Sequence, residues 1–277
     1  MRYRKTIIIS TVAVFVLASV LSFVWLFRVR RTEISATYTD ESGAAVYDYA
    51  EGVIYGCTLG KSVFFVDLGA LKDKLEENAY LRVDKLEKVY PDKIYAEIGR
   101  REEKFAIKSG EYYYLTDENF VFLGKTADVG FFGDKVVPVT VENTEIDLSS
   151  AVAGKKTDFG GEALLGYMLK IFDGIDGGER LISSVTVNGD KYGANRNRIY
   201  FATYTGVTFE FRFSYDGEIS DEEKILSARL GLCDSVAALN EKFASLDEKQ
   251  KSEGYIAVYL KDDLSVAVDY YKGKKDV

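Results

Sequence analysis

The sequence predicts an α+β protein with three parts: an N-terminal transmembrane helix, a strand–helix–helix–strand–strand module, and a mainly antiparallel β-sheet domain with flanking helices. Three observations support this prediction. Residues 7–27 form an uncharged apolar run. Later segments alternate between apolar and polar residues with the period of a strand, and a few show the stripe of an amphipathic helix. The chain also contains 20 tyrosines and 17 phenylalanines but only two prolines, a composition typical of sheet-rich proteins.

The apolar run reads IIISTVAVFVLASVLSFVWLF. As a helix it would extend roughly 31 Å, which matches the hydrocarbon core of a bilayer. The alternative is a cleaved signal peptide, whose apolar region is shorter, about 7–15 residues, and ends at small residues. Because this run is longer and ends in Trp25-Leu26-Phe27, we expect an uncleaved membrane anchor.

The rest of the chain is strongly acidic. The whole sequence has 36 basic and 44 acidic residues, and residues 1–31 hold six of the basic residues and no acidic one. The remainder therefore has 30 basic against 44 acidic residues, a net charge of −14. Because nucleic-acid phosphates are bound by lysine and arginine, we expect no nucleic-acid partner.

Few residues in the sequence are suited to catalysis. There is no histidine, which removes the commonest general base and the commonest metal ligand. The Ser-x-x-Lys and Gly-x-Ser-x-Gly patterns of nucleophilic enzymes are also absent. Carboxylate pairs such as Glu102-Glu103 and Asp262-Asp263 are typical of solvated turns. The sequence therefore favours a protein without a catalytic site, a metal, a cofactor or a small-molecule substrate.

Two further features have alternative interpretations. Residues 54–65 read IYGCTLGKSVFF and are similar to a phosphate-binding loop, but only three residues separate Gly56 from Gly60, where that loop requires four. We therefore expect no nucleotide site. Cys57 and Cys233 belong to no paired metal-ligand pattern, and we interpret them as buried small apolar residues, with a disulfide between them as the alternative.

The order of the predicted elements divides the body into two regions. In the first, strands are expected at 34–39, 80–89 and 93–100 and helices at 43–53 and 66–77, the latter capped by Asp67. The charged run 100–104 is expected to be solvated. In the second, strands are expected at 105–108, 112–116, 120–123, 136–141, 181–187, 199–203, 207–213, 255–260 and 265–271. A helix is expected at 161–172. A capping box of Ser220 and Glu223 predicts the start of a second helical stretch, which extends to about residue 248 and contains Gly231 as a candidate interruption.

Four segments, taken in order, resemble the FtsQ/DivIB family of bacterial division proteins. They are GCTLGKSVFFVDLGALKDKL, LEKVYPDKIYAEIGRREEKFAI, YYYLTDENFVFL, and the stretch from SVTV through FEFRFSYDGEISDEEKILSARLGL. The resemblance implies a cytoplasmic tail (1–6), the transmembrane helix (7–27), a POTRA module (28–103), a β domain (104–271) and a short tail (272–277). It also implies that Gly56 to Phe65 form the linker between the two helices of the module. The chain departs from the family in its nearly absent polar tail and in a weak turn after the first strand.

The resemblance further implies a function. It predicts a non-catalytic single-pass membrane scaffold at the division septum, with its N-terminus in the cytoplasm and its other domains outside it. The implied partners are single-pass proteins of the FtsL and FtsB/DivIC types, together with other division proteins that contact the POTRA module. An alternative is a POTRA-containing, membrane-anchored assembly or transport module unrelated to division. An acidic extracellular enzyme is a third class, but no residue constellation supports it.

The predicted partner-binding site is the last strand, where the family's FtsB/DivIC partner adds a strand of its own. By position this strand consists of Ser265, Val266, Ala267, Val268, Asp269, Tyr270 and Tyr271. Tyr270 corresponds to the family's terminal aromatic contact. The alternative is that Val266 and Val268 face the core and that Tyr270 covers a surface, and both can hold because alternate residues of a strand point in opposite directions.

Overall fold

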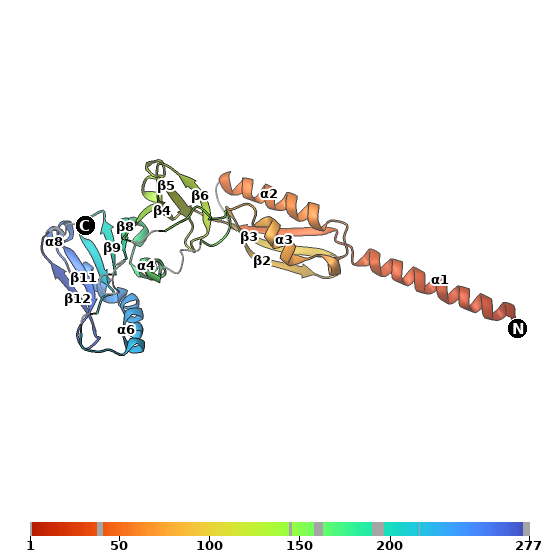
Figure 1. Ribbon diagram of the computed structural model, residues 1–277. Helices are drawn as coiled ribbons and strands as arrows, with labels where there is room; N and C mark the ends of the chain where they lie inside the picture. Colours follow the sequence, from red (N-terminus) through yellow and green to blue (C-terminus); the bar gives the residue numbers. More distant parts are fainter. Residues whose placement is uncertain are drawn as a thin grey trace. The chain divides into compact units, whose positions relative to one another are not determined.

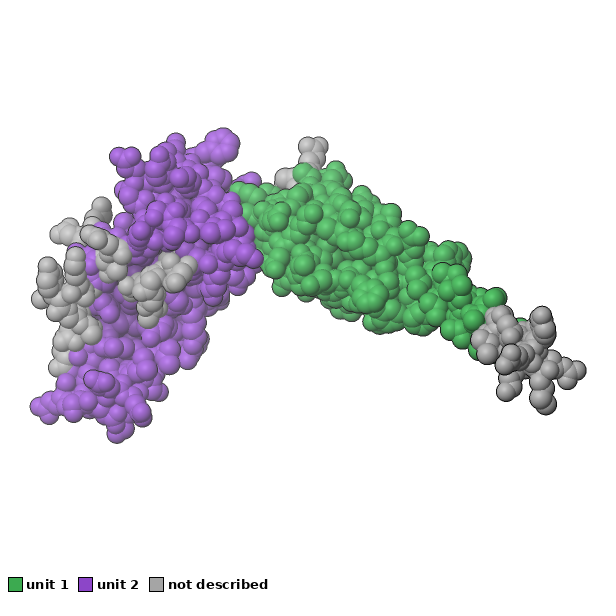
Figure 2. All heavy atoms as spheres, turned by 45° about the vertical axis from the view of Figure 1, so that its right-hand side comes forward, with its two compact units in different colours: residues 1–101 green, residues 102–277 purple. Residues whose placement is uncertain are grey.

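The computed structural model describes residues 2–37, 41–143, 146–157, 163–189, 197–215 and 217–273, with only the backbone described for residues 2–10, 37, 41, 42, 163 and 179. The chain divides into two compact units, Met1–Arg101 and Glu102–Val277, here called unit 1 and unit 2 (Figure 2). Four predicted features lie wholly or partly outside the described residues: the first residue of the N-terminal tail, the end of the first strand at 38–39, the start of the helix at 161–162, and most of the C-terminal tail, 274–277.

Unit 1 contains a small three-stranded sheet with two helices on one face (Figure 1). Its elements are α1 (Arg2–Leu26), β1 (Arg31–Thr37), α2 (Glu41–Thr58), the 3-10 helix η1 (Val63–Phe65), α3 (Leu68–Leu75), β2 (Leu81–Val89) and β3 (Lys93–Arg100). The central strand β3 pairs in parallel with β1 and antiparallel with β2. After α1, this is the strand–helix–helix–strand–strand order expected from the sequence.

The predicted transmembrane helix is not found. Within the described parts of the chain, no helix has both the length and the apolar character needed to cross a membrane, so the predicted anchor and the single-pass membrane localisation are corrected. The prediction rested on the length and apolar character of residues 7–27 taken as one continuous span.

The core of unit 1 follows from the period of its elements. Ile94, Ala96 and Ile98 alternate along β3 and are fully buried against α2 and α3. Asp67 caps α3 as predicted, because its carboxylate accepts hydrogen bonds from the amides of Gly69 and Ala70. The charged run 100–104 is not entirely solvated, since Arg101 is buried and its guanidinium donates to backbone carbonyls of unit 1.

Unit 2 is built on a large nine-stranded sheet. Its strands are β4 (Phe105–Ser109), β5 (Tyr112–Thr116), β6 (Phe122–Thr126), β7 (Val137–Glu142), β8 (Ile182–Asn188), β9 (Arg198–Thr203), β10 (Thr208–Arg212), β11 (Tyr255–Leu260) and β12 (Val266–Tyr271). Its helices are η2 (Gly130–Lys135), α4 (Ala163–Gly174), α5 (Gly178–Leu181), α6 (Glu222–Asp234), α7 (Val236–Ala244) and α8 (Glu248–Ser252). The strands lie in the order β12-β11-β10-β9-β8-β7-β4-β5-β6.

The large sheet is mixed: most of its strand pairs are antiparallel, as expected from the sequence, but three are parallel, which the sequence did not predict. Three neighbouring pairs are parallel, namely β4 with β7, β7 with β8, and β10 with β11, and the other five are antiparallel. A parallel pair needs a long crossover connection. Helices α4 and α5 provide it between β7 and β8, and α6 to α8 provide it between β10 and β11.

The main core of unit 2 lies on one face of the large sheet, and a smaller cluster of Ala106, Leu115 and Val136 lies on the other face beside β4 and β5. Helices α4, α6 and α7 contribute buried side chains to the main core, including Met168, Leu232 and Leu239. In the described part of the chain, no helix layer covers the opposite face beside β9 to β12. The predicted helical stretch to about residue 248 differs in two respects: Asp221, not Ser220, caps α6, and the stretch forms two helices, α6 and α7, with a break at Ser235. Gly231 lies inside α6 and does not interrupt it.

Both cysteines are free: Cys57 is partly exposed, and Cys233 on α6 is buried as predicted. Burial raises the pKa of the Cys233 thiol from 9.0 to about 11, although Lys170 nearby opposes this. The Cys233 thiol therefore loses its proton at a lower pH in the unfolded chain than in the folded chain. Its contribution to the free energy of unfolding is complete below pH 9 and is lost as the pH rises toward 11.

We expect the Cys233→Ala variant to lose less stability than the parent chain between pH 9 and 11. Urea unfolding of both proteins across this range tests this, because the tyrosines and lysines titrate in both and cancel in the comparison. A difference in unfolding free energy that stays constant with pH contradicts the prediction.

Candidate partner-binding edge of the large sheet

Strand β12 forms one edge of the large sheet (Figure 1). It covers all but the first residue of the predicted site, since Ser265 precedes the strand. It pairs antiparallel with β11 in a regular register that joins Tyr255 to Tyr271 and Leu260 to Val266. In the described part of the chain, no strand pairs with its other side. The edge therefore offers unpaired backbone groups to a further strand.

The register shows which backbone groups face outward. At the turn, the Lys261 amide donates to the Ser265 carbonyl at 2.9 Å, which makes these two residues a hydrogen-bonded pair. Hydrogen-bonded and non-hydrogen-bonded pairs alternate along an antiparallel ladder. Ala267, Asp269 and Tyr271 therefore bond to β11. The N–H and C=O groups of three intervening residues point to the open edge: Val266, Val268 and Tyr270.

The side chains of these same three residues face the core. Val266, Val268 and Tyr270 pack, partly buried, against the core cluster of unit 2. The Tyr270 hydroxyl donates to the backbone carbonyl of Glu253 at 2.9 Å. This geometry agrees with the alternative interpretation, in which the valines face the core and Tyr270 covers a surface. The backbone of Tyr270, rather than its ring, faces the open edge.

The other three side chains of β12 lie on the face without the helix layer. Tyr271 stacks on Tyr255, with ring centroids 5.0 Å apart and an angle of 14° between the rings. The Asp269 carboxylate accepts a hydrogen bond from the Tyr259 hydroxyl at 2.7 Å. This bond and a second one with Tyr271 raise the pKa of Tyr259. An ordered polar and aromatic surface therefore borders the open edge.

A buried carboxylate stabilises this face two strands from the edge. The side chain of Glu210 is fully buried between Arg198, at 3.1 Å, and Arg212, at 2.8 Å. The sequence reasoning did not identify this cluster. The signal was present in the alternating strands RIYFAT and TFEFR, where the charged residues share the face opposite the phenylalanines.

Two other edge strands, β6 and β2, are better protected than β12. At β6, the backbone of Phe122 already bonds to Lys155 and Gly154. At β2, a bulge interrupts the register near Asp84, and the strand carries ion pairs such as Lys85 with Glu87 at 3.0 Å. Bulges and charged side chains discourage the addition of a strand. β12 has a regular register and a single charged side chain.

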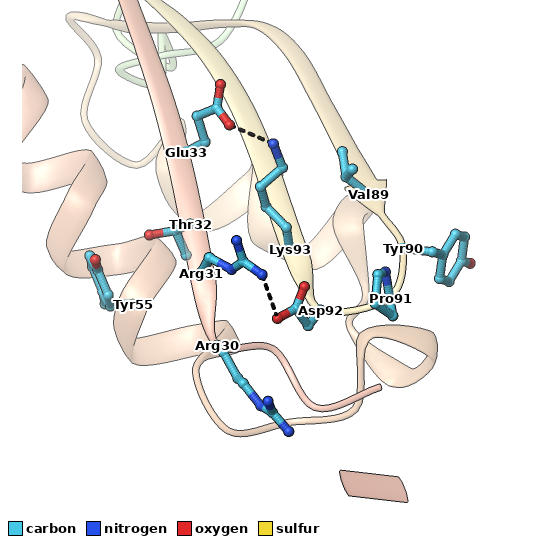
Figure 3. A pocket seen from close by; sticks show the side chains of 10 residues that line it. All are labelled: Arg30, Arg31, Thr32, Glu33, Tyr55, Val89, Tyr90, Pro91, Asp92 and Lys93. Atoms are coloured by element: carbon cyan, nitrogen blue, oxygen red, sulfur yellow. Dashed lines mark hydrogen bonds and ion pairs between the residues drawn. The ribbon is translucent and has the colours of Figure 1, made fainter. Parts of the chain in front are cut away.

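Unit 1 has a pocket of about 490 Å³ beside β1 and the turn between β2 and β3 (Figure 3). In Figure 3, Arg31 points toward Asp92, at 3.4 Å, and Lys93 points toward Glu33, at 2.5 Å. Four of its charged groups thus form two ion pairs, and the fifth, Arg30, donates to the backbone carbonyl of Trp25. Among the described residues, no group of three or more cysteines, aspartates or glutamates is placed to hold a metal ion.

The Gly-Lys-Ser segment connects α2 to α3. The Gly60 amide donates to the Val29 carbonyl, and the Lys61 amide donates to the Thr58 carbonyl, both at 3.0 Å. Gly60 has a φ of +79°, which suits glycine. A phosphate-binding loop needs its amides free to surround an anion, and these amides are bonded within the protein. The segment is therefore a structural linker.

Comparison with known proteins gives no match: no family model fits this chain, and no curated protein is similar to it.

Proposed function

We propose that this protein is a non-catalytic scaffold of the bacterial division machinery, of the FtsQ/DivIB type. Its role is to bring together septal cell-wall synthesis partners of the FtsL and FtsB/DivIC types. The observation that supports this best is the unprotected edge of β12, at the strand where the resemblance places the partner. The strand–helix–helix–strand–strand order of unit 1 agrees with a POTRA module, through which other division proteins would bind.

Binding at this edge proceeds by strand addition. A strand of the FtsB/DivIC-type partner pairs with the outward backbone groups of Val266, Val268 and Tyr270, extending the large sheet by one strand. Backbone hydrogen bonds supply affinity without requiring a pocket, and the alternate side chains supply specificity. Each bond contributes about 0.5–1.5 kcal/mol net, so several bonds together are needed for a stable complex.

We expect the Val268→Pro variant to bind the partner at least tenfold more weakly than the parent chain. Proline removes an N–H that points to the open edge, so a partner strand loses a bond and meets the ring instead. Proline is tolerated on edge strands where the N–H faces solvent, so the pairing with β11 is retained. The measurement is a calorimetric titration of the full chain with the purified FtsB/DivIC-type protein.

The matched control is Val268→Ala, which shortens the same side chain and keeps the N–H. Urea unfolding confirms that both variants remain folded. We expect Val268→Ala to bind within about threefold of the parent chain, because the altered side chain faces the core and not the partner. If the parent chain does not bind, or if Val268→Pro binds as tightly as Val268→Ala, the proposed edge is wrong.

The second candidate is a POTRA-type assembly or transport module unrelated to division. The order of elements in unit 1 is compatible with both functions, so unit 1 does not distinguish them. Localisation of the fluorescently tagged chain in dividing cells distinguishes the two functions. Concentration at the division site supports the division scaffold, and an even distribution through the cell cycle supports the second candidate.

A further inference from the structure

We infer that the partner strand carries an aromatic residue opposite Tyr271 and a basic residue opposite Asp269. This inference rests on the proposed function and describes the sequence of the strand that the β12 edge selects. It concerns the side chains on the face without the helix layer, whereas strand addition itself depends on the backbone.

The geometry of the edge brings these side chains close to a partner. If an antiparallel strand bonds to the backbone of Val266, Val268 and Tyr270, then Asp269 and Tyr271 occupy the non-hydrogen-bonded positions. Residues opposite each other at such positions lie closer together, with Cα atoms about 4.5 Å apart rather than 5.5 Å. Cross-strand side-chain pairs are the main source of sequence preference in a sheet.

Tyr271 supports an aromatic neighbour. One face of its ring stacks on Tyr255 of β11, and the side chain remains 37% exposed at the edge of the sheet. An aromatic residue on the added strand extends this row from two rings to three. Aromatic pairs contribute beyond the area that they bury, which corresponds to a preference of about 3- to 10-fold.

Asp269 supports a basic neighbour. Its carboxylate is exposed, and one oxygen accepts the Tyr259 hydroxyl, which holds the group in place. The nearest arginines on this face, Arg198 and Arg212, bind Glu210 instead. Asp269 is the single charged residue of β12, so its carboxylate is the group of this strand with which a lysine or arginine on the added strand can form an ion pair. The neighbouring Ala267 is too small to obstruct it.

The test for the basic neighbour of Asp269 reverses the charge at this position and, separately, the charge of basic residues on the partner. In calorimetric titrations, Asp269→Lys is expected to weaken binding of the FtsB/DivIC-type protein at least tenfold. Partner variants with one lysine or arginine changed to glutamate are then titrated against both chains. One of them is expected to bind Asp269→Lys more tightly than it binds the parent chain. The control, Glu222→Lys, makes the same charge change at an exposed residue on α6 and should bind as the parent does.

The test for the ring uses two substitutions at one position. Tyr271→Phe keeps the ring and is expected to bind within about twofold, whereas Tyr271→Ser is expected to lose about 3- to 10-fold in affinity. Tyr112→Ala removes an exposed tyrosine on β5 and serves as the control. If Val268→Pro disrupts binding but the Asp269 and Tyr271 variants do not, this inference fails and the proposed function stands. If the parent chain does not bind, the proposed function itself fails.

Discussion

Replacing Phe201 with alanine is expected to lower the free energy of unfolding of unit 2 by about 3–5 kcal/mol. Phe201 lies on β9, near the middle of the large sheet, and has no exposed surface. Its ring packs edge-on against Phe211 of β10, with centroids 5.8 Å apart. Truncation removes buried apolar area and leaves a cavity that strands fixed on both sides cannot close. Urea unfolding monitored by circular dichroism measures the loss.

The matched control is Phe131→Ala in η2, because Phe131 is 90% exposed and undergoes the same chemical change. We expect its free energy of unfolding to change by no more than about 0.5 kcal/mol. A similar loss in both variants would show that the core is not organised around the β9–β10 phenylalanines. Because the same sheet carries β12, the Phe201 variant should also weaken partner binding at temperatures where unit 2 begins to unfold.

Local patterns in the sequence predicted the strands well. The segment KIYAEIGR alternates cleanly, and β3 has the predicted bounds, Lys93–Arg100. The segment 120–123 was less regular, and β6 begins only at Phe122 because Phe120 adopts a left-handed φ of 61° in the preceding turn. The sequence was sufficient to predict the bounds of a strand where a regular alternation of apolar and polar residues determines them. It was not sufficient where the preceding turn adopts an unusual backbone conformation.

Local sequence patterns did not predict which strands pair when they are far apart in the sequence. The parallel contact of β10 with β11 joins segments separated by three helices, and nothing within TFEFR or YIAVYL specifies it. The same limit applies to the candidate site. The sequence placed the site at 265–271, but the direction of each backbone group depends on the register with β11. The membrane-spanning helix was predicted from apolar length alone, and the described part of the chain contains no helix that meets that requirement.

Replacing Glu210 with alanine is expected to destabilise unit 2 by about 3 kcal/mol. Glu210 is fully buried, and each of its carboxylate oxygens accepts a hydrogen bond from one arginine, Arg198 or Arg212. Without the carboxylate, two guanidinium groups that are only 34% and 27% exposed lose their counter-charge and lie side by side on neighbouring strands. Like charges directly opposite each other in a sheet are themselves destabilising. Urea unfolding of the variant measures the total cost.

Two further variants separate the ion cluster from a general loss of packing. Lys170→Ala removes an exposed ion pair with Asp234 and should cost less than about 1 kcal/mol. The triple variant Arg198→Met, Glu210→Leu and Arg212→Met replaces the whole cluster with apolar side chains of similar size. It should recover most of the stability lost in Glu210→Ala, because the penalty comes from leaving charges without a partner and not from removing the cluster as a unit. If the triple variant is as unstable as Glu210→Ala, then the ion cluster makes a net contribution that apolar packing does not replace. Partner binding by a stable triple variant would further show that the face beside β12 requires an ordered surface there, and not these particular charges.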